Sequence, residues 1–247
     1  MFESEARPTL VRGGGEVWPK RLIKMAGTFI TFEGTEGSGK STQIALLAER
    51  LQKLGISVVR TREPGGTKLG EGIRRLVLDP SAEEIDPLTE LLLMEAARAQ
   101  HVHECVGPAL KEGSLVLCDR FTDSTVIYQG VVRGLDLEVV KNLNRLATGD
   151  IRPDTTILLD LDVSIGLKRK SAQTAASGRP EGEQETNELT RFDLEDQSFH
   201  DLVREGFLRL AQEEPDRIKV VSATGTQKEV HERVWKALEK TLEAVVS

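Results

Sequence analysis

Long apolar runs and paired cysteines are two features that this 247-residue sequence lacks. No apolar stretch approaches the roughly 18 residues that a membrane-spanning helix requires, so we expect no membrane partner. Of the two cysteines, Cys118 ends an apolar segment, which favours a buried free thiol over half of a disulfide. Cys105 lies in a polar helical stretch. Nothing indicates an oxidising compartment, and we expect a cytoplasmic protein.

Positive charge is also in short supply. The chain has 33 Lys and Arg against 40 Asp and Glu, a net charge of −7. This balance argues against nonspecific binding of nucleic acid through a basic face. The length suits one sizeable α/β domain, which we expect at residues 25–247. Residues 1–24 have neither periodicity nor the apolar segment of a signal peptide, so we expect a disordered N-terminal extension, or a natural start at Met25.

Five short apolar segments alternate with helical patterns along the chain. They lack strict alternation, which is typical of strands buried on both faces of a parallel sheet. The predicted strands are Thr28–Glu33, Ser57–Thr61, Leu115–Cys118, Thr156–Leu161 and Arg217–Val221. The predicted helices are Thr42–Leu54, Leu69–Leu78, Leu88–Lys111, Leu137–Thr148, Ser164–Lys170, Leu194–Glu213 and Lys228–Val246. The alternation predicts a three-layer α/β sandwich with a five-stranded parallel sheet and right-handed crossovers.

The segment GTEGSGKST joins the first predicted strand to the first helix and matches the pattern G-x-x-x-x-G-K-[ST]. Its glycines let backbone N–H groups point at a phosphate, and the helix N-terminus adds partial positive charge. Lys40 is placed to reach the β- and γ-phosphates, and the Ser41 hydroxyl to ligate Mg²⁺. The alternative is a glycine-rich turn with an incidental lysine, which the correct flanks disfavour. The predicted ATP-binding residues are Gly34, Thr35, Glu36, Gly37, Ser38, Gly39, Lys40, Ser41 and Thr42, with Mg²⁺ as cofactor.

Ligands of such a sheet bind at the carboxyl ends of the strands, so the residues that follow each strand indicate the site. Arg62 follows the second strand in a shaped Pro-Gly-Gly loop, where it either binds a second phosphate or is an exposed side chain of a structural turn. Asp119 directly follows the third strand, in the position of a Mg²⁺-binding aspartate. Arg120 then presents a planar fork suited to phosphate. Thr125, Tyr128 and Gln129 follow at i, i+3 and i+4, on one helical face.

Two further segments have two interpretations each. Met94 and Arg98 share a face of the long predicted helix, and on this segment alone we favour an Arg98 that extends to water beside an apolar stripe. Ser171 to Thr190 is polar and cannot bury a core, which predicts a mobile loop. Because arginines bracket it, we interpret residues 169–191 as a lid, with a solvated surface insertion as the alternative.

Taken together, these segments resemble the bacterial thymidylate kinases, a family of P-loop nucleoside monophosphate kinases. The matching stretches are FEGTEGSGKST, TREPGGT, MEAARAQH, LVLCDRFTDSTVIYQG, RPDTTILLDLD and RFDLEDQSFH. They run in order from Phe32 to His200. The resemblance implies a P-loop kinase fold with a lid, transfer of phosphate from ATP to dTMP, and a homodimer, with the Leu88–Lys111 helix as a candidate interface.

The resemblance also implies roles for individual residues. Those it places around dTMP are Glu36, Arg62, Met94, Arg98, Arg120, Ser124, Thr125, Tyr128 and Gln129. Those it implies in catalysis are Lys40, Glu36, Arg120, Arg191 and Asp119. It places Arg169 on the ATP side, and Ser41 and Asp119 on the metal.

Three positions depart from the family pattern. Met94 stands where many relatives have a phenylalanine that stacks on thymine. Thr190 stands where an aspartate often precedes the lid arginine. Gly37 stands where some relatives carry a phosphate-loop arginine, so we expect the lid to supply that charge through Arg191.

Three other functions remain to be weighed. A kinase of dUMP, AMP, GMP or a nucleoside differs only in its acceptor. A regulatory P-loop switch requires an N-K-x-D stretch, and the sequence has none. A P-loop ATPase acting on nucleic acid is disfavoured by the acidic charge.

Overall fold

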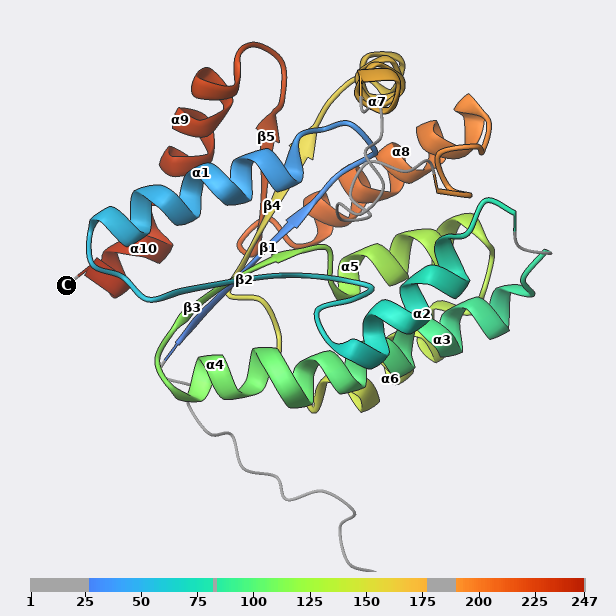
Figure 1. Ribbon diagram of the computed structural model, residues 1–247, viewed down its shortest axis with the longest axis horizontal. Helices are drawn as coiled ribbons and strands as arrows, with labels where there is room; N and C mark the ends of the chain where they lie inside the picture. Colours follow the sequence, from blue (N-terminus) through green and yellow to red (C-terminus); the bar gives the residue numbers. More distant parts are fainter. Residues whose placement is uncertain (1–26, 82–83, 177–189, 247) are drawn as a thin grey trace, which may run out of the picture.

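A five-stranded parallel sheet forms the centre of the fold (Figure 1). The computed structural model describes residues 27–81, 84–176 and 190–246; the expected extension at 1–24, Met25 and residues 177–189 of the predicted lid lie outside them. The strands are β1 (Thr28–Glu33), β2 (Val58–Arg62), β3 (Leu115–Asp119), β4 (Thr155–Asp160) and β5 (Ile218–Ser222), in the order β2-β3-β1-β4-β5. The predicted α/β sheet is confirmed, and each strand lies within one or two residues of its predicted range.

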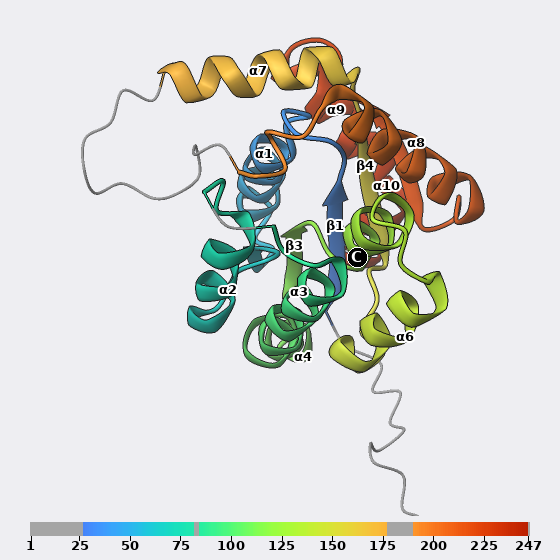
Figure 2. The same ribbon diagram turned by 90° about the vertical axis from the view of Figure 1, so that its right-hand side faces the viewer.

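Helices cover both faces of the sheet, which explains why the central strands β1, β3 and β4 are buried almost throughout, while the edge strands β2 and β5 are more exposed. On one face lie α1 (Lys40–Lys53), α9 (Gln227–Ala237) and α10 (Glu239–Val246). On the other lie α3 (Pro87–His101), α4 (Gly107–Lys111), α5 (Thr122–Thr125), α6 (Leu137–Thr148) and α8 (Gln197–Glu213), with α2 (Lys68–Leu78) packed on α3. Figure 2 shows α7 (Val163–Ala176) extending away from the sheet above the end of β4.

Three clusters of buried apolar side chains hold these layers together. On the α1 face, Ile30, Phe32 and Leu117 of the sheet pack with Leu47 and Leu51 of α1, all at most 1% exposed. On the other face, one cluster joins side chains of α2, α3 and α8 with Leu158 of β4, and another joins Phe29 and Val116 of the sheet with Leu110 of α4. Burial of each large apolar side chain contributes about 1.5–3 kcal/mol, so these clusters fix the strand ends that carry the polar residues.

Several predicted helices have different bounds in the structure. The expected single helix Leu88–Lys111 consists of α3, a π-helical segment η1 (Val102–Val106) and α4. The face predicted for Thr125, Tyr128 and Gln129 crosses from α5 into a second π-helical segment, η2 (Val126–Val132). The predicted loop from Ser171 is wrong for its first six residues, which extend α7 to Ala176, since the alanines and the glutamine among them favour helix. None of the described helices is long and apolar enough to cross a membrane.

Candidate active site

The loop between β1 and α1 has the shape that binds phosphate, and its lysine is folded onto the loop. The Lys40 ammonium donates to the carbonyl oxygens of Gly34 at 3.0 Å and Thr35 at 3.1 Å. Burial, and then the nearby Arg120, lower the pKa of Lys40 to about 8. The lysine is therefore held among the loop carbonyls, next to the helix N-terminus that attracts anions.

Gly37 brings this loop into backbone contact with α7. Its φ is +68°, a left-handed conformation that favours glycine. A Cβ built on Gly37 would lie 2.1 Å from the carbonyl oxygen of Gly166 in α7. The structure thus gives a reason for glycine at this position: neither the conformation nor the contact with α7 accommodates a side chain.

Ser41 and Asp119 lie together where a metal ion is expected. The Ser41 hydroxyl donates to Oδ2 of Asp119 at 2.8 Å, linking the start of α1 to the end of β3. The described residues contain no cluster of three or more metal-ligating side chains. Mg²⁺ commonly binds through one or two protein oxygens, with phosphate and water completing its coordination. A hydroxyl and a carboxylate beside a phosphate loop therefore fit Mg²⁺.

Glu36, inside the loop, gathers three side chains around its carboxylate. Arg120 Nη2 donates to its Oε1 at 2.7 Å, and the Tyr128 hydroxyl donates to the same oxygen at 2.9 Å. His200 Nδ1 of α8 lies 3.3 Å from Oε2. Although burial opposes the charge of Glu36, Arg120 and His200 hold its pKa well below the ordinary value. Glu36 is thus an ionised carboxylate held among a guanidinium, a phenol and an imidazole.

Glu33, a residue that the sequence analysis missed, fixes the segment that carries Arg120. Its carboxylate is fully buried and accepts from the Phe121 N–H at 2.9 Å, and from the Ser124 N–H at 3.3 Å and hydroxyl at 2.6 Å. Arg120 itself has a φ of +69°, a strained conformation for a non-glycine residue. Burial raises the pKa of Glu33 to about 7. Glu33 thus holds the turn that directs Arg120 toward Glu36.

One cavity of about 660 Å³ lies beside these groups. Its lining includes every residue that the sequence analysis places around the acceptor: Glu36, Arg62, Met94, Arg98, Arg120, Ser124, Thr125, Tyr128 and Gln129. It also includes Gly37, Gly39, Lys40, Ser41, Thr42 and Asp119 of the donor and metal sets. Gly34, Thr35 and Ser38 of the predicted donor set do not line this cavity. The other loop residues and the predicted acceptor groups face a shared space at the carboxyl ends of the strands.

The cavity also has lining residues that the sequence analysis did not select. Arg74 lies behind the Pro-Gly-Gly loop and donates to the carbonyl of Pro64 at 3.0 Å, and Lys170 comes from α7. Arg62, which the sequence analysis did select, forms an ion pair with Glu71 of α2 at 2.9 Å. The position of Arg74 in the sequence pattern of α2 does not indicate that its side chain lines a cavity.

Arg98 has a different environment from the one its own segment suggests. It is 3% exposed, so the expectation that it extends to water is wrong. Its partners include Glu63, which follows β2, and Glu95 on its own helix. Glu63 is distant from Arg98 in the sequence, so no local sequence pattern predicts this ion pair.

The two arginines predicted at the lid lie outside the cavity lining. Arg191 Nε donates to the carbonyl of Val77 at 2.5 Å, and Arg191 Nη2 donates to the buried carboxylate of Glu90. Arg169 Nη1 lies 3.5 Å from the carbonyl of Ala223, in the loop after β5. Arg191 thus contacts α2 and α3 rather than the phosphate loop, and its catalytic role stays a prediction.

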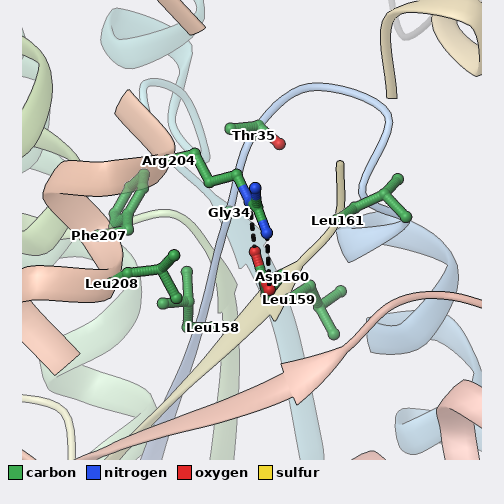
Figure 3. Close-up of a pocket in the computed structure, with 9 residues that line it drawn as sticks. All are labelled: Gly34, Thr35, Leu158, Leu159, Asp160, Leu161, Arg204, Phe207 and Leu208. Atoms are coloured by element: carbon green, nitrogen blue, oxygen red, sulfur yellow. Dashed lines mark hydrogen bonds and ion pairs between the residues drawn. The ribbon is translucent and has the colours of Figure 1, made fainter. Parts of the chain in front are cut away.

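A second hollow lies behind the phosphate loop, where Arg204 of α8 forms hydrogen bonds of 2.7 and 3.1 Å with Asp160 at the end of β4 (Figure 3). Its volume of about 10 Å³ accommodates a single water at most. The hollow is therefore not a ligand site, and the ion pair packs behind the phosphate loop.

Comparisons with known proteins agree with this geometry. A family model described as thymidylate kinase matches residues 32–234, a range that contains the elements around the cavity. The thymidylate kinase of Syntrophotalea carbinolica is 51% identical over 207 residues, covering 84% of this chain and 93% of that protein. That of Geobacter sulfurreducens is 52% identical over 195 residues, covering 79% and 88%. The crystal structure of thymidylate kinase from Ehrlichia chaffeensis superposes with a TM-score of 0.67 at 37% identity, covering 86% and 98%.

Proposed function

Because this chain belongs to the thymidylate kinase family, we propose that the cavity is its active site and that the predicted residues act there as donor, metal and acceptor groups. The chain phosphorylates dTMP to dTDP with ATP, a step of dTTP biosynthesis. The observation that supports the residue assignment is the shared cavity, which all nine predicted acceptor residues line together with Lys40.

On the donor side, the loop amides of Gly34–Thr42 hold the ATP phosphates, and Lys40 exchanges its two loop carbonyls for phosphate oxygens. Arg169, beside the carbonyl of Ala223, binds the same nucleotide. Ser41 and Asp119 hold Mg²⁺, whose charge offsets that of the phosphates when it is bound. The metal assignment rests on the fit of these two oxygens.

On the acceptor side, Arg62 and Arg120 bind the dTMP phosphate. Each is now paired with a carboxylate, Glu71 and Glu36 respectively, so the incoming phosphate competes with that partner. Tyr128 closes on the deoxyribose beside Ser124 and Thr125, where a 2′-hydroxyl would crowd. Arg98 reads the thymine edge together with Gln129, and Met94 packs on the ring through its thioether.

Transfer itself requires in-line placement and positive charge around the migrating phosphoryl group. Lys40, Arg120 and the metal supply charge from the cavity. We propose that Arg191 adds to it when the lid (residues 169–191) closes, which requires its guanidinium to leave Glu90 and the Val77 carbonyl. Lid closure also excludes water and so limits ATP hydrolysis.

We further propose that the protein is a cytoplasmic homodimer that acts without nucleic acid or membrane partners. Support for the dimer comes from leucines on the packed helices α2 and α3: Leu76, Leu88 and Leu92 are 62%, 47% and 49% exposed. Light scattering after size exclusion should give a dimer for the parent and a monomer for Leu92→Glu. A monomeric parent at micromolar concentration contradicts this part of the proposal.

The acceptor range is the experiment that tests the function. ADP release is measured with dTMP, dUMP, AMP, GMP and thymidine, each at saturating ATP and Mg²⁺. We expect a kcat/KM for dTMP at least about tenfold above that for any other acceptor, because the base pocket distinguishes acceptors by contacts of 1–3 kcal/mol each. Met94→Phe tests whether the thioether relaxes this preference. A different preferred acceptor contradicts the assignment.

A further inference from the structure

Arg98 is almost saturated with hydrogen bonds before any ligand binds. A guanidinium has five N–H donors. Four are accounted for: Nε–H donates to Glu63 at 2.8 Å, the two on Nη1 donate to Glu95 at 2.5 Å and Asn144 at 2.7 Å, and one on Nη2 donates to the Phe121 carbonyl at 3.2 Å. Within the described residues, a single Nη2 hydrogen therefore has no acceptor, and Arg98 lines the cavity.

Glu63 joins this arginine to His101, which lies at the end of α3 and does not line the cavity. Glu63 Oε2 accepts from Arg98, while its Oε1 lies 2.8 Å from Nδ1 of His101. Nε2 of His101 lies 2.5 Å from the hydroxyl of Thr61. Gly66 leaves room for the ring, since a Cβ there would lie 2.6 Å from Cδ2 of His101. His101 therefore contacts other protein groups and not the cavity, and it is fully buried.

The N–H on Nδ1 of His101 determines which oxygen of Glu63 is available to Arg98. Burial disfavours the imidazolium, but the Cys105 thiol on η1 and the Glu63 carboxylate together raise the pKa of His101 to about 9. The ring is thus protonated at neutral pH and donates through both nitrogens. Its donor at Nδ1 occupies Oε1 of Glu63, so Glu63 contacts Arg98 through one oxygen only.

Without that donor, Glu63 Oε1 is free to form a second contact with Arg98. Arginine and carboxylate pair preferentially through two parallel hydrogen bonds, here Nε–H and the free N–H of Nη2. The second bond would take the one hydrogen that is left for a ligand. We propose that His101 and Glu63 are positioning residues that keep one N–H of Arg98 free to donate to a carbonyl oxygen of the acceptor base; this rests on the proposed function.

Calorimetric titration of the full chain tests the proposal with two ligands. One is dTMP, and the other is 2-deoxyribose 5-phosphate, which keeps the sugar and phosphate but has no base. His101→Leu should weaken dTMP binding by about 10- to 100-fold, the equivalent of one hydrogen bond from a charged group. Binding of 2-deoxyribose 5-phosphate, and kcat at saturating dTMP, should stay within about threefold of the parent.

His101→Asn is the matched control, because an asparagine amide can place an N–H near the position of Nδ1. It should keep dTMP affinity within about threefold of the parent. Equal losses for both ligands, an unchanged dTMP affinity in His101→Leu, or an asparagine variant as weak as the leucine variant would each overturn the proposal. Failure of the proposed function is distinct, because the parent itself would then release no ADP with dTMP.

Discussion

Arg191→Ala separates two effects that the structure couples. If the lid arginine acts on the transition state, its removal should lower kcat by on the order of 10³-fold with a modest change in KM. The same change also removes a partner of Glu90, whose carboxylate is fully buried. Glu90 would keep the Gln129 amide at 2.5 Å and Arg133 Nε at 3.9 Å. Breaking one partner from a buried ion pair costs about 3 kcal/mol, and these remaining contacts keep the loss near that lower figure.

For a chain of this size, that loss corresponds to a Tm lower by about 6–12 °C. The matched variant is Arg191→Ala with Glu90→Gln, which removes the unpaired charge while an amide still meets Gln129. It should restore the free energy of unfolding to within about 1 kcal/mol of the parent. Its kcat should remain low if Arg191 acts on the phosphoryl group.

The assays are thermal unfolding and steady-state ADP release at saturating ATP and dTMP. A kcat for Arg191→Ala within about fivefold of the parent, measured well below its Tm, refutes the catalytic role. Recovery of kcat in the double variant also refutes the catalytic role, because Arg191 would then act only through its ion pair with Glu90 of α3.

Three further predictions concern the loop, the metal and the buried acid. Gly37→Ala should lower the free energy of unfolding by at least about 2 kcal/mol in urea titration, from its positive φ and the Gly166 contact; an unchanged stability would show that α7 moves freely. Ser41→Ala should raise the Mg²⁺ concentration for half-maximal activity about tenfold, and an unchanged Mg²⁺ titration would argue against the ligand. Glu33 has a raised pKa, so its contribution to stability is complete below about 4.5 and is lost as pH rises through about 7. Glu33→Gln should therefore gain about 3 kcal/mol relative to the parent between pH 4.5 and 8 in denaturant titrations, and a constant difference would contradict the raised pKa.

Much of the fold follows from the sequence because its three central strands are buried on both faces. Nearly continuous apolar segments such as Leu115–Asp119 carry that signal on their own. The loop glycines and the residues after each strand then indicate the site, because a parallel sheet brings its carboxyl ends to one edge. This geometry is why predicted residues from distant segments, such as Arg62 and Gln129, line one cavity.

The pairing of buried charged side chains could not be predicted from the sequence. Arg98 looks like a surface arginine beside an apolar stripe until Glu63 is placed against it from another element. Glu33 looks like the last residue of a strand, yet it holds the turn at Arg120 through three hydrogen bonds. His200 lies far along the chain from Glu36, and only the packing of α8 brings them together. Such contacts depend on tertiary position, which local periodicity does not encode.

The cations of the cavity already have partners: Lys40 has two loop carbonyls, Arg62 has Glu71 and Arg120 has Glu36. In the proposed function, a substrate phosphate would therefore replace partners that these cations already have, rather than meet unpaired charges. A weak anion such as chloride or acetate gains little by displacing a carboxylate that is already well placed. A phosphate, with more charge and more acceptor oxygens, is better able to win that exchange. The existing partners of Lys40, Arg62 and Arg120 thus favour the binding of phosphorylated ligands over that of simple anions in the surrounding solution.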